Sequence, residues 1–326
     1  MLTTEEFLNQ PESYQKKVTC LYHKNCLDGF MSMVVAKTAV EKCGELFEYF
    51  PMAYGDEVPQ SALECDRMYV LDFSLDPDFL KREDLPEIVI LDHHLSAVEK
   101  YGMEGDHMLT PKTRVLLNQS KSGCVLTWED FYGSNSFNEL CLVVQDRDLW
   151  NFEMEETKAI NAYLWSLDFD VYKWQDIFEP SSLSMNSQAY INHDIYEKGM
   201  IILYQQNAYV RQHLTESGDG LPICEYIKES FGHKVSFVNA SVLQSDIGNA
   251  MLDKDSSTGI ALVYYFKSDM SAKVSLRSRK SETIDVSKVA GLFGGGGHKN
   301  AAGFTLTPYM AKKLLTERNP VQEASD

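Results

Sequence analysis

The 326-residue chain is longer than one ordinary domain of roughly 100 to 200 residues, so two domains are expected. Its 44% hydrophobic and 24% charged residues are typical of a soluble globular protein and exclude a disordered or collagen-like chain. The formal net charge of -18 argues against binding to duplex nucleic acid, because long polyanions are repelled. A small anionic substrate stays compatible with this charge if positive charge, including that of a bound cation, is concentrated in one cleft.

The composition also predicts a cytoplasmic protein without a membrane span. No apolar run reaches the length of about 18 residues that a spanning helix needs, and the first residues are acidic and polar, unlike a signal peptide. The seven cysteines form an odd set without a CxxC pair, which indicates reduced thiols.

The N-terminal half predicts an α/β domain with a doubly wound, mainly parallel sheet. Helices are expected at about 30–42, 122–132 and 138–144. Short apolar runs that are typical of strands lie at 18–22, 46–50, 68–73 and 87–92. The last two runs are continuously apolar, as in parallel strands that are buried on both faces.

A long helix, predicted at 188–214, connects this domain, 1–187, to a smaller α/β domain, 215–326. A glycine-rich loop at 291–304 is expected to close the second domain before a short C-terminal helix. The predicted strands of this domain lie at 235–240, 258–266 and 272–278.

Acidic and histidine residues follow the predicted strands of the first domain or lie beside them. The carboxyl ends of parallel strands meet at one edge of a sheet, where open α/β sheets bind ligands. A lone carboxylate is usually a helix cap or a solvated residue, but four clusters in succession favour a shared site. Carboxylates and imidazoles together suit Mn²⁺, Mg²⁺ or a related divalent ion. The clusters lie at 22–29, at Asp72, at 92–94 and at 146–148.

Five motifs, in this order, resemble those of the DHH phosphoesterase family, in which a DHH domain precedes a DHHA1 domain. They are YHKNCLDGF at 22–30, VLDFS at 70–74, ILDHH at 90–94, VQDRD at 144–148 and GGGGHKNAAGF at 294–304. Their joint occurrence is far more specific than any single glycine pattern. The resemblance implies a divalent-metal-dependent phosphodiesterase in which the DHHA1 domain holds the substrate, the DHH domain cleaves it, and the active cleft lies at the seam between them.

The resemblance also implies the roles of individual residues. Mn²⁺ is the expected ion, with Mg²⁺ and Co²⁺ as alternatives, in one or two copies. The implied metal ligands are His23, Asp28, Asp72, His93 and Asp146. Neighbouring side chains point in different directions, so His94 suits phosphate contact or proton transfer, and Asp92 suits the orientation of a ligand. Asp148 and Arg147 are interpreted as an exposed ion pair.

Cys26 departs from the family pattern. It stands where the family commonly has an aspartate, two places before the position of Asp28, and the spacing from His23 to Asp28 is one residue shorter than in many members. Three interpretations stay open: the thiolate is a metal ligand, the site binds one metal tightly and a second weakly, or Cys26 only packs.

The second domain carries the expected substrate-binding residues. A glycine run lets backbone N–H groups approach an anion closely, and Arg277 and Arg279 share one face of a predicted strand. The other residues in this set are Gly295, Gly296, Gly297, His298 and Asn300.

We expect hydrolysis of short oligoribonucleotides and linear dinucleotides, such as pGpG and pApA, to mononucleotides by attack of a metal-activated water on phosphorus. Cyclic dinucleotides are further candidate substrates. The alternatives are a phosphatase acting on 3'-phosphoadenosine 5'-phosphate, a polyphosphate or pyrophosphate hydrolase, and a nucleotide-binding regulator with weakened catalysis. The resemblance also suggests single-stranded substrates and a homodimer.

Overall fold

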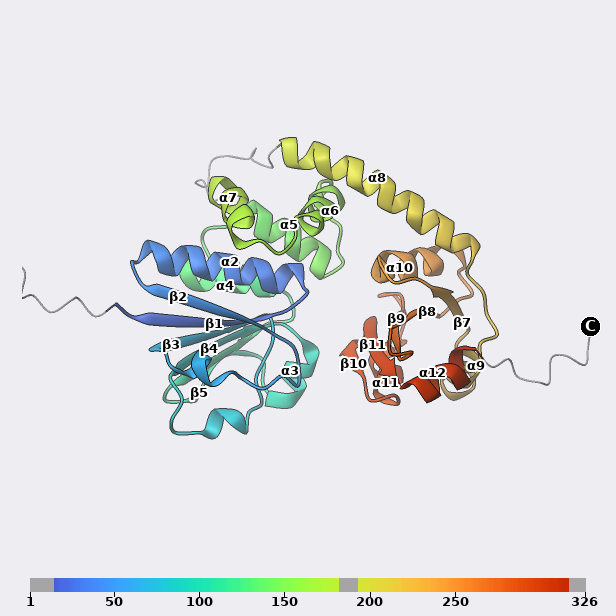
Figure 1. Ribbon diagram of the computed structural model, residues 1–326, viewed down its shortest axis with the longest axis horizontal. Coiled ribbons are helices and arrows are strands. Elements are labelled where there is room, and N and C mark those ends of the chain that lie inside the picture. Colours follow the sequence, from blue (N-terminus) through green and yellow to red (C-terminus); the bar gives the residue numbers. More distant parts are fainter. Residues whose placement is uncertain (1–14, 182–192, 317–326) are drawn as a thin grey trace, which may run out of the picture. The chain divides into compact units, whose positions relative to one another are not determined.

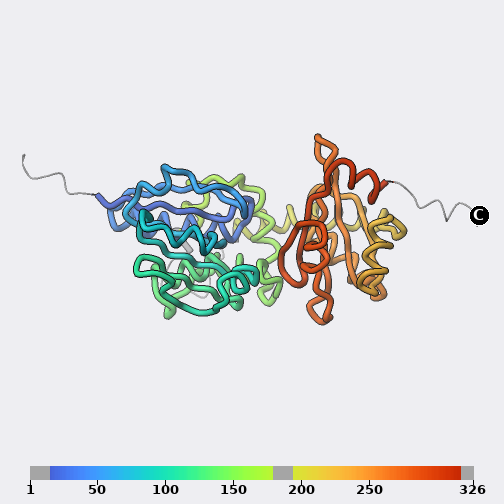
Figure 2. Tube along the Cα trace, turned by 90° about the horizontal axis from the view of Figure 1, so that it is seen from below, coloured from blue at the N-terminus to red at the C-terminus, as the bar shows by residue number. Residues whose placement is uncertain are grey.

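The computed structural model describes residues 15–181 and 193–316. The chain forms two compact units, Met1–Ile202 and Leu203–Asp326, and the division falls within one long helix, α8 (His193–Thr215). Figure 2 shows the first unit in blue to green and the second in yellow to red. Part of the predicted connecting helix, 188–192, lies outside the described residues. The functional boundaries at 187 and 214 stay predictions.

The first unit is built on a six-stranded sheet with the order β2-β1-β3-β4-β6-β5. The first five strands in this order are parallel, and β5 pairs antiparallel with β6 at the edge. The strands are β1 (Lys17–His23), β2 (Leu46–Met52), β3 (Arg67–Leu71), β4 (Glu87–Asp92), β5 (Gly105–Thr110) and β6 (Thr113–Leu117). The sequence analysis did not predict β5 and β6, because β5 is a largely exposed edge strand without an apolar run.

Helices cover both faces of this sheet, which confirms the predicted doubly wound α/β architecture (Figure 1). One face packs against α2 (Leu27–Lys42) and α4 (Gly123–Tyr132), and the outer helices α5 (Glu139–Asp148), α6 (Thr157–Ser166) and α7 (Val171–Ser181) pack on the far side of these two. The other face packs against α3 (Leu95–Tyr101) and the short 3-10 helices η1 (Gln60–Leu63) and η2 (Phe79–Lys81). An amphipathic helix was predicted at 30–42, but α2 is buried on all sides from Leu27 to Val40, because it lies between the sheet and the outer helices.

The second unit has a five-stranded mixed sheet with the order β10-β11-β9-β8-β7. Its strands are β7 (Val235–Asn239), β8 (Ile260–Phe266), β9 (Ala272–Arg277), β10 (Gly296–His298) and β11 (Ala301–Leu306). Helix α10 (Gln244–Lys254) packs on one face, and α9 (Pro222–Phe231), α11 (Val286–Gly291) and α12 (Pro308–Leu315) pack on the other. Part of the predicted glycine-rich loop is therefore a hairpin, since β10 and β11 pair antiparallel.

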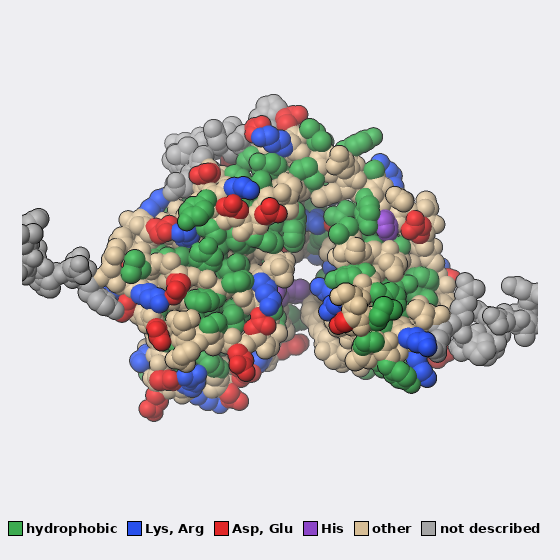
Figure 3. Space-filling view, in the orientation of Figure 1, with side chains coloured by type: hydrophobic (Ala, Val, Ile, Leu, Met, Phe, Trp, Pro, Cys, Tyr) green, Lys and Arg blue, Asp and Glu red, His purple; other side chains and the backbone are tan. Residues whose placement is uncertain are grey.

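Among the described residues, no helix is both long and apolar enough to cross a bilayer. Acidic and basic side chains are interspersed on the face shown in Figure 3. The net charge of -18 is therefore not expressed as a uniformly acidic surface on that face.

Candidate metal centre

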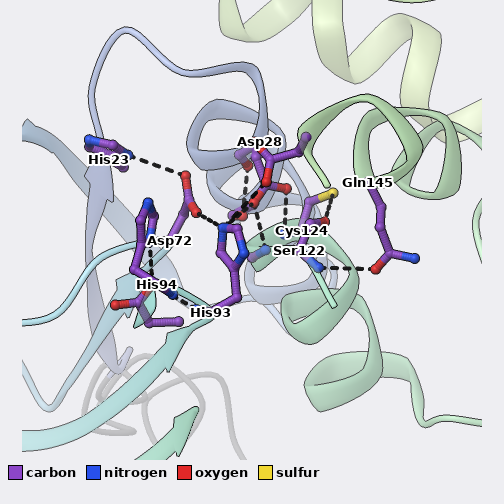
Figure 4. Close-up of polar contacts among 12 residues, drawn as sticks. His23, Asp28, Asp72, His93, His94, Ser122, Cys124 and Gln145 are labelled. Carbon is purple, nitrogen blue, oxygen red and sulfur yellow. Dashed lines mark hydrogen bonds and ion pairs between the residues drawn. The ribbon is translucent and has the colours of Figure 1, made fainter. Parts of the chain in front are cut away.

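Three neighbouring strands of the first unit end at the same edge, and the predicted ligands leave the sheet there. His23 is the last residue of β1, Asp72 directly follows β3, and His93 directly follows β4. These strands are adjacent and parallel, so their carboxyl ends lie side by side. Asp28 joins them from the first turn of α2. The structure thus brings together four of the five predicted ligands, as Figure 4 shows.

The side chains form two groups of three, and within each group the ligand atoms lie within 4.8 Å of one another. The groups are His23, Asp72 and His94, and Asp28, His93 and Asp148. His93 connects them, because its Nε2 atom lies 3.1 Å from Asp72 Oδ1. The same atom lies 3.7 Å from Asp28 Oδ2 and 3.4 Å from Asp148 Oδ2. The arrangement offers two adjoining positions for a cation.

Burial and mutual repulsion perturb the titration of this cluster. Burial raises the pKa of Asp28 well above its ordinary value, and the charges of Asp72 and Asp148 add to this effect. Burial also raises the pKa of Asp72, but the interactions with His23 and His93 lower it by more. The pKa of Asp72 is therefore well below its ordinary value. Burial lowers the pKa of His93, but the hydrogen bond to Asp72 and the nearby carboxylate charges raise it overall. A proton on His93 relieves repulsion among the carboxylates, and a divalent cation would do the same.

The residues present fit a divalent metal ion. Two buried atoms, His23 Nδ1 and Asp72 Oδ2, face each other at 3.5 Å and make no hydrogen bond within the described part of the chain. Buried polar atoms without partners are costly, and a ligand between them would satisfy both. Imidazole nitrogens and carboxylate oxygens are donors that suit Mn²⁺ and Mg²⁺.

The N-terminus of α4 fixes Asp28. The backbone N–H groups of Gly123 and Cys124 donate to its two carboxylate oxygens at 2.6 and 2.9 Å. Position 123 has no room for a side chain, because a Cβ atom there would lie 2.7 Å from Asp72 Cβ and 3.0 Å from Asp28 Oδ2. Gln145 in turn accepts a hydrogen bond from the backbone N–H of Ser122, at the start of the same helix. The sequence analysis missed these supporting residues, which all lie more than 90 positions after Asp28.

Asp92 orients both histidines of the DHH motif. Its Oδ1 atom accepts hydrogen bonds from the backbone N–H groups of His93 at 2.7 Å and His94 at 3.2 Å, and lies 2.7 Å from His94 Nδ1. Its Oδ2 atom accepts a hydrogen bond from Ser74 Oγ at 2.6 Å. When a carboxylate forms a hydrogen bond with one ring nitrogen of a histidine, the other ring nitrogen can bind a metal. This arrangement is common for histidine ligands. His94 was predicted to contact phosphate or transfer a proton, whereas the geometry places it with His23 and Asp72 as a candidate ligand.

Asp146 differs from its predicted role. Its carboxylate accepts hydrogen bonds from the backbone N–H groups of Glu153 and Met154 and from Thr157 Oγ1, and it belongs to neither ligand group of the described residues. It therefore holds the turn between α5 and α6. The carboxylate that joins the cluster is Asp148, which was interpreted as an exposed ion pair with Arg147. Asp148 is exposed, but it follows the buried residues Cys141 and Val144 of α5 at helical spacing, which is the signal that could have identified it.

Cys26 lies at the N-cap position of α2, and among the described residues it belongs to neither ligand group. Burial raises the pKa of its thiol well above the ordinary value, and the charges of Asp72, Asp148 and Asp28 act in the same direction. The position of Cys26 outside both ligand groups favours packing over ligation by a thiolate.

The predicted substrate-binding residues of the second unit divide into two kinds. Arg279 donates to the carbonyl oxygens of Leu252, Asp255 and Thr258, and Asn300 donates to Ser278 Oγ and to the carbonyl oxygen of Arg279. These contacts tie the end of β9 to its surroundings and correct the expectation that both side chains face substrate.

The remaining members are Arg277, His298 and three glycines. Arg277 is half-buried and donates to Ser245 Oγ at 2.6 Å, and His298 lies in β10. A Cβ atom at Gly295 or Gly297 would collide with the backbone of β11, whereas Gly296 is exposed with open space around it. Packing of the hairpin therefore explains two of these glycines, and a role in substrate binding stays a prediction.

Comparison with known proteins agrees with this architecture. The profile of the DHHA1 domain matches residues 233–319. Oligoribonuclease NrnB of Bacillus subtilis (strain 168) is 26% identical over 325 residues, which cover 91% of this chain and 75% of that protein. An uncharacterized protein of Acanthamoeba polyphaga mimivirus is 26% identical over 312 residues, which cover 88% of this chain and 67% of the viral protein.

A solved structure of exonuclease RecJ bound to manganese shares the fold, with a TM-score of 0.51 and 13% identity, over 95% of this chain and 93% of that chain. Together, the fold and the site define an α/β protein with two adjoining groups of side chains that fit a divalent metal ion. Residues 233–319 therefore match the DHHA1 domain, and the chain shares its fold with exonuclease RecJ.

Proposed function

We propose that the protein hydrolyses short oligoribonucleotides and linear dinucleotides, such as pGpG and pApA, to mononucleotides. The observation that carries this proposal is the pair of adjoining ligand groups connected by His93 at the carboxyl edge of the parallel sheet. Similarity to the oligoribonuclease NrnB along most of the chain supports the substrate class.

The proposed chemistry divides the work between a bound ion and the side chains around it. When bound, a divalent ion supplies charge stabilisation for the phosphoryl oxygens and an activated water. His23, Asp72 and His94 would hold one ion, and Asp28, His93 and Asp148 would hold another or share the first. Asp92 keeps His94 in a fixed orientation, and the α4 N-terminus keeps Asp28 in place. We assign Mn²⁺ as the working ion, with Mg²⁺ and Co²⁺ as alternatives.

The proposal extends to where and on what the enzyme acts. The substrates are single-stranded and short, because a chain with a net charge of -18 repels long polyanions. Duplex nucleic acid is not a substrate in this account. The assembly is a homodimer, and the activity is cytoplasmic.

A product profile tests the substrate class. Purified protein with Mn²⁺ is incubated with pGpG, pApA, longer RNA, cyclic dinucleotides, 3'-phosphoadenosine 5'-phosphate and polyphosphate. Release of mononucleotides from pGpG and pApA is expected. Release of free phosphate from the last two substrates alone would replace the proposal with a phosphatase or polyphosphate hydrolase. Turnover that survives in both Asp28→Ala and His93→Ala would show that the cluster is not the catalytic centre.

A further inference from the structure

Tyr54 lies beside the candidate metal centre, although the sequence analysis did not single it out. Its ring centroid is 5.9 Å from that of His23 and 6.0 Å from that of His94, and it contacts both rings edge-on. The residue is nevertheless 51% exposed. A large aromatic surface is therefore presented to solvent next to two of the candidate ligands.

The loop that carries Tyr54 is tied to the site. Asp56 accepts hydrogen bonds from Lys24 Nζ at 2.6 Å and from the backbone N–H of Ala53 at 2.9 Å. Lys24 directly follows His23, and its backbone N–H donates to the carbonyl oxygen of Met52 at 2.8 Å. The loop after β2 is thereby fastened to the end of β1 on both sides of Tyr54.

The side chain itself is also held. The Tyr54 hydroxyl lies near the side chain of Ser96 and the backbone of Ser74, and its ring meets Phe73 edge-on at 6.2 Å. An exposed aromatic ring whose orientation is already fixed loses little conformational entropy when a planar ligand stacks on it.

We propose that Tyr54 is the stacking surface for a nucleobase of the substrate, next to the phosphate at the metal centre. The inference rests on the proposed function and adds a residue that determines how the substrate is held. Aromatic rings beside a phosphate-binding site bind nucleobases through their π faces, and this stacking is tolerant of sequence. When a phosphate lies at the metal centre, the planar base of the attached nucleoside is within reach of the Tyr54 ring, because that ring contacts His23 and His94.

The test compares Tyr54→Ala and Tyr54→Phe with Tyr172→Ala, which removes a 75% exposed tyrosine from α7. The ligands are a 5'-phosphorylated GpG with a phosphorothioate linkage and two analogues, each lacking one of the bases. Calorimetry with Mn²⁺ present gives the Kd of each ligand, and a separate titration gives the Kd of Mn²⁺ alone.

Tyr54→Ala is expected to weaken binding of the complete dinucleotide by roughly 5- to 100-fold. The loss should disappear with one of the two abasic analogues, which identifies the stacked base. Tyr54→Phe and Tyr172→Ala should bind within about threefold of wild type, since neither removes the stacking ring. The Kd of Mn²⁺ should not change in any variant.

Three results would overturn the stacking role: an unchanged Kd in Tyr54→Ala, an equal loss for all three ligands, or a weakened Mn²⁺ affinity. The last two would show that Tyr54 acts by supporting the histidines. Turnover of pGpG by the wild type is measured separately. If wild type binds the dinucleotide with the expected dependence on Tyr54 but releases no mononucleotides, the proposed function fails and the stacking role stands. A wild type that does not bind the dinucleotide overturns both.

Discussion

The two acidic residues at the end of α5 should respond in opposite ways to the same substitution. Asp148 lies 3.4 Å from His93 Nε2 in one ligand group, whereas the Asp146 carboxylate accepts hydrogen bonds within its own turn. Asp148→Asn should therefore remove a metal ligand with little effect on the metal-free fold. Asp146→Asn should weaken the fold and leave metal binding intact. Each variant is the matched control for the other.

The magnitudes follow from these contacts. Removing a direct ligand should weaken Mn²⁺ binding at this group by at least the 10- to 100-fold that is typical when a residue behind a ligand is removed. At a Mn²⁺ concentration about 100 times the wild-type Kd, bound metal adds roughly 2.7 kcal/mol to the free energy of unfolding. A 100-fold weaker Kd reduces this contribution to about 0.4 kcal/mol.

The metal-free proteins should show the reverse ranking. Desolvation raises the pKa of Asp148, the charge of His93 opposes this, and the charge of Asp72 raises the pKa further, so loss of the Asp148 charge removes a net destabilising interaction. Asp146→Asn instead weakens hydrogen bonds to a charged acceptor, which costs about 1.5 to 3 kcal/mol. Thermal unfolding of both variants with EDTA measures the stability of the metal-free proteins, and the same measurement with Mn²⁺ gives the stability that bound metal adds. Calorimetry measures the Kd of Mn²⁺ for each variant. Loss of Mn²⁺ binding in Asp146→Asn but not in Asp148→Asn would refute the reasoning.

Three further substitutions test the support around the cluster and in the second unit. Gly123→Ala should lower both Mn²⁺ affinity and the free energy of unfolding, the latter by about 1 to 3 kcal/mol, because the new Cβ atom would lie 2.7 Å from Asp72 Cβ. Gly296→Ala, in open space, is its control in denaturant unfolding. Asp92→Asn should weaken Mn²⁺ binding about 10- to 100-fold in calorimetry, because the anchor of the His94 ring is altered; an unchanged affinity would argue against His94 as a ligand. Arg279→Ala should destabilise the second unit by about 1.5 to 3 kcal/mol in denaturant unfolding, because buried carbonyl oxygens lose a charged donor, while Mn²⁺ binding stays unchanged. A stable variant with a raised KM would restore the predicted substrate contact.

The apolar runs were sufficient to predict four of the six strands of the first sheet, and the resemblance to the DHH family implied four of the candidate ligands, three of which lie at the ends of those strands. Polar residues at the ends of the strands predicted at 68–73 and 87–92 lie at one edge of the sheet, and they meet because these two strands are parallel neighbours. The same logic could not choose between Asp146 and Asp148. Both are carboxylates near the end of one helix, and the choice depends on backbone N–H groups of Glu153 and Met154 that meet Asp146 only after the turn is folded.

Long-range contacts explain the other differences. Gly123 meets Asp28 only because α4 packs beside α2, and Tyr54 reaches the histidines because β2 and β1 are neighbours in the sheet. In the second unit, the glycine run contains residues in two settings that look alike in the sequence. Gly295 and Gly297 make room for β11, whereas Gly296 has open space around it.

The most direct test of the metal centre is anomalous diffraction at the manganese edge from crystals grown with Mn²⁺. Manganese should lie between the two groups, with His23, Asp72 and His94 on one side and Asp28, His93 and Asp148 on the other. Manganese bound elsewhere, or ligated by Asp146 with Asp148 turned away, would contradict this account.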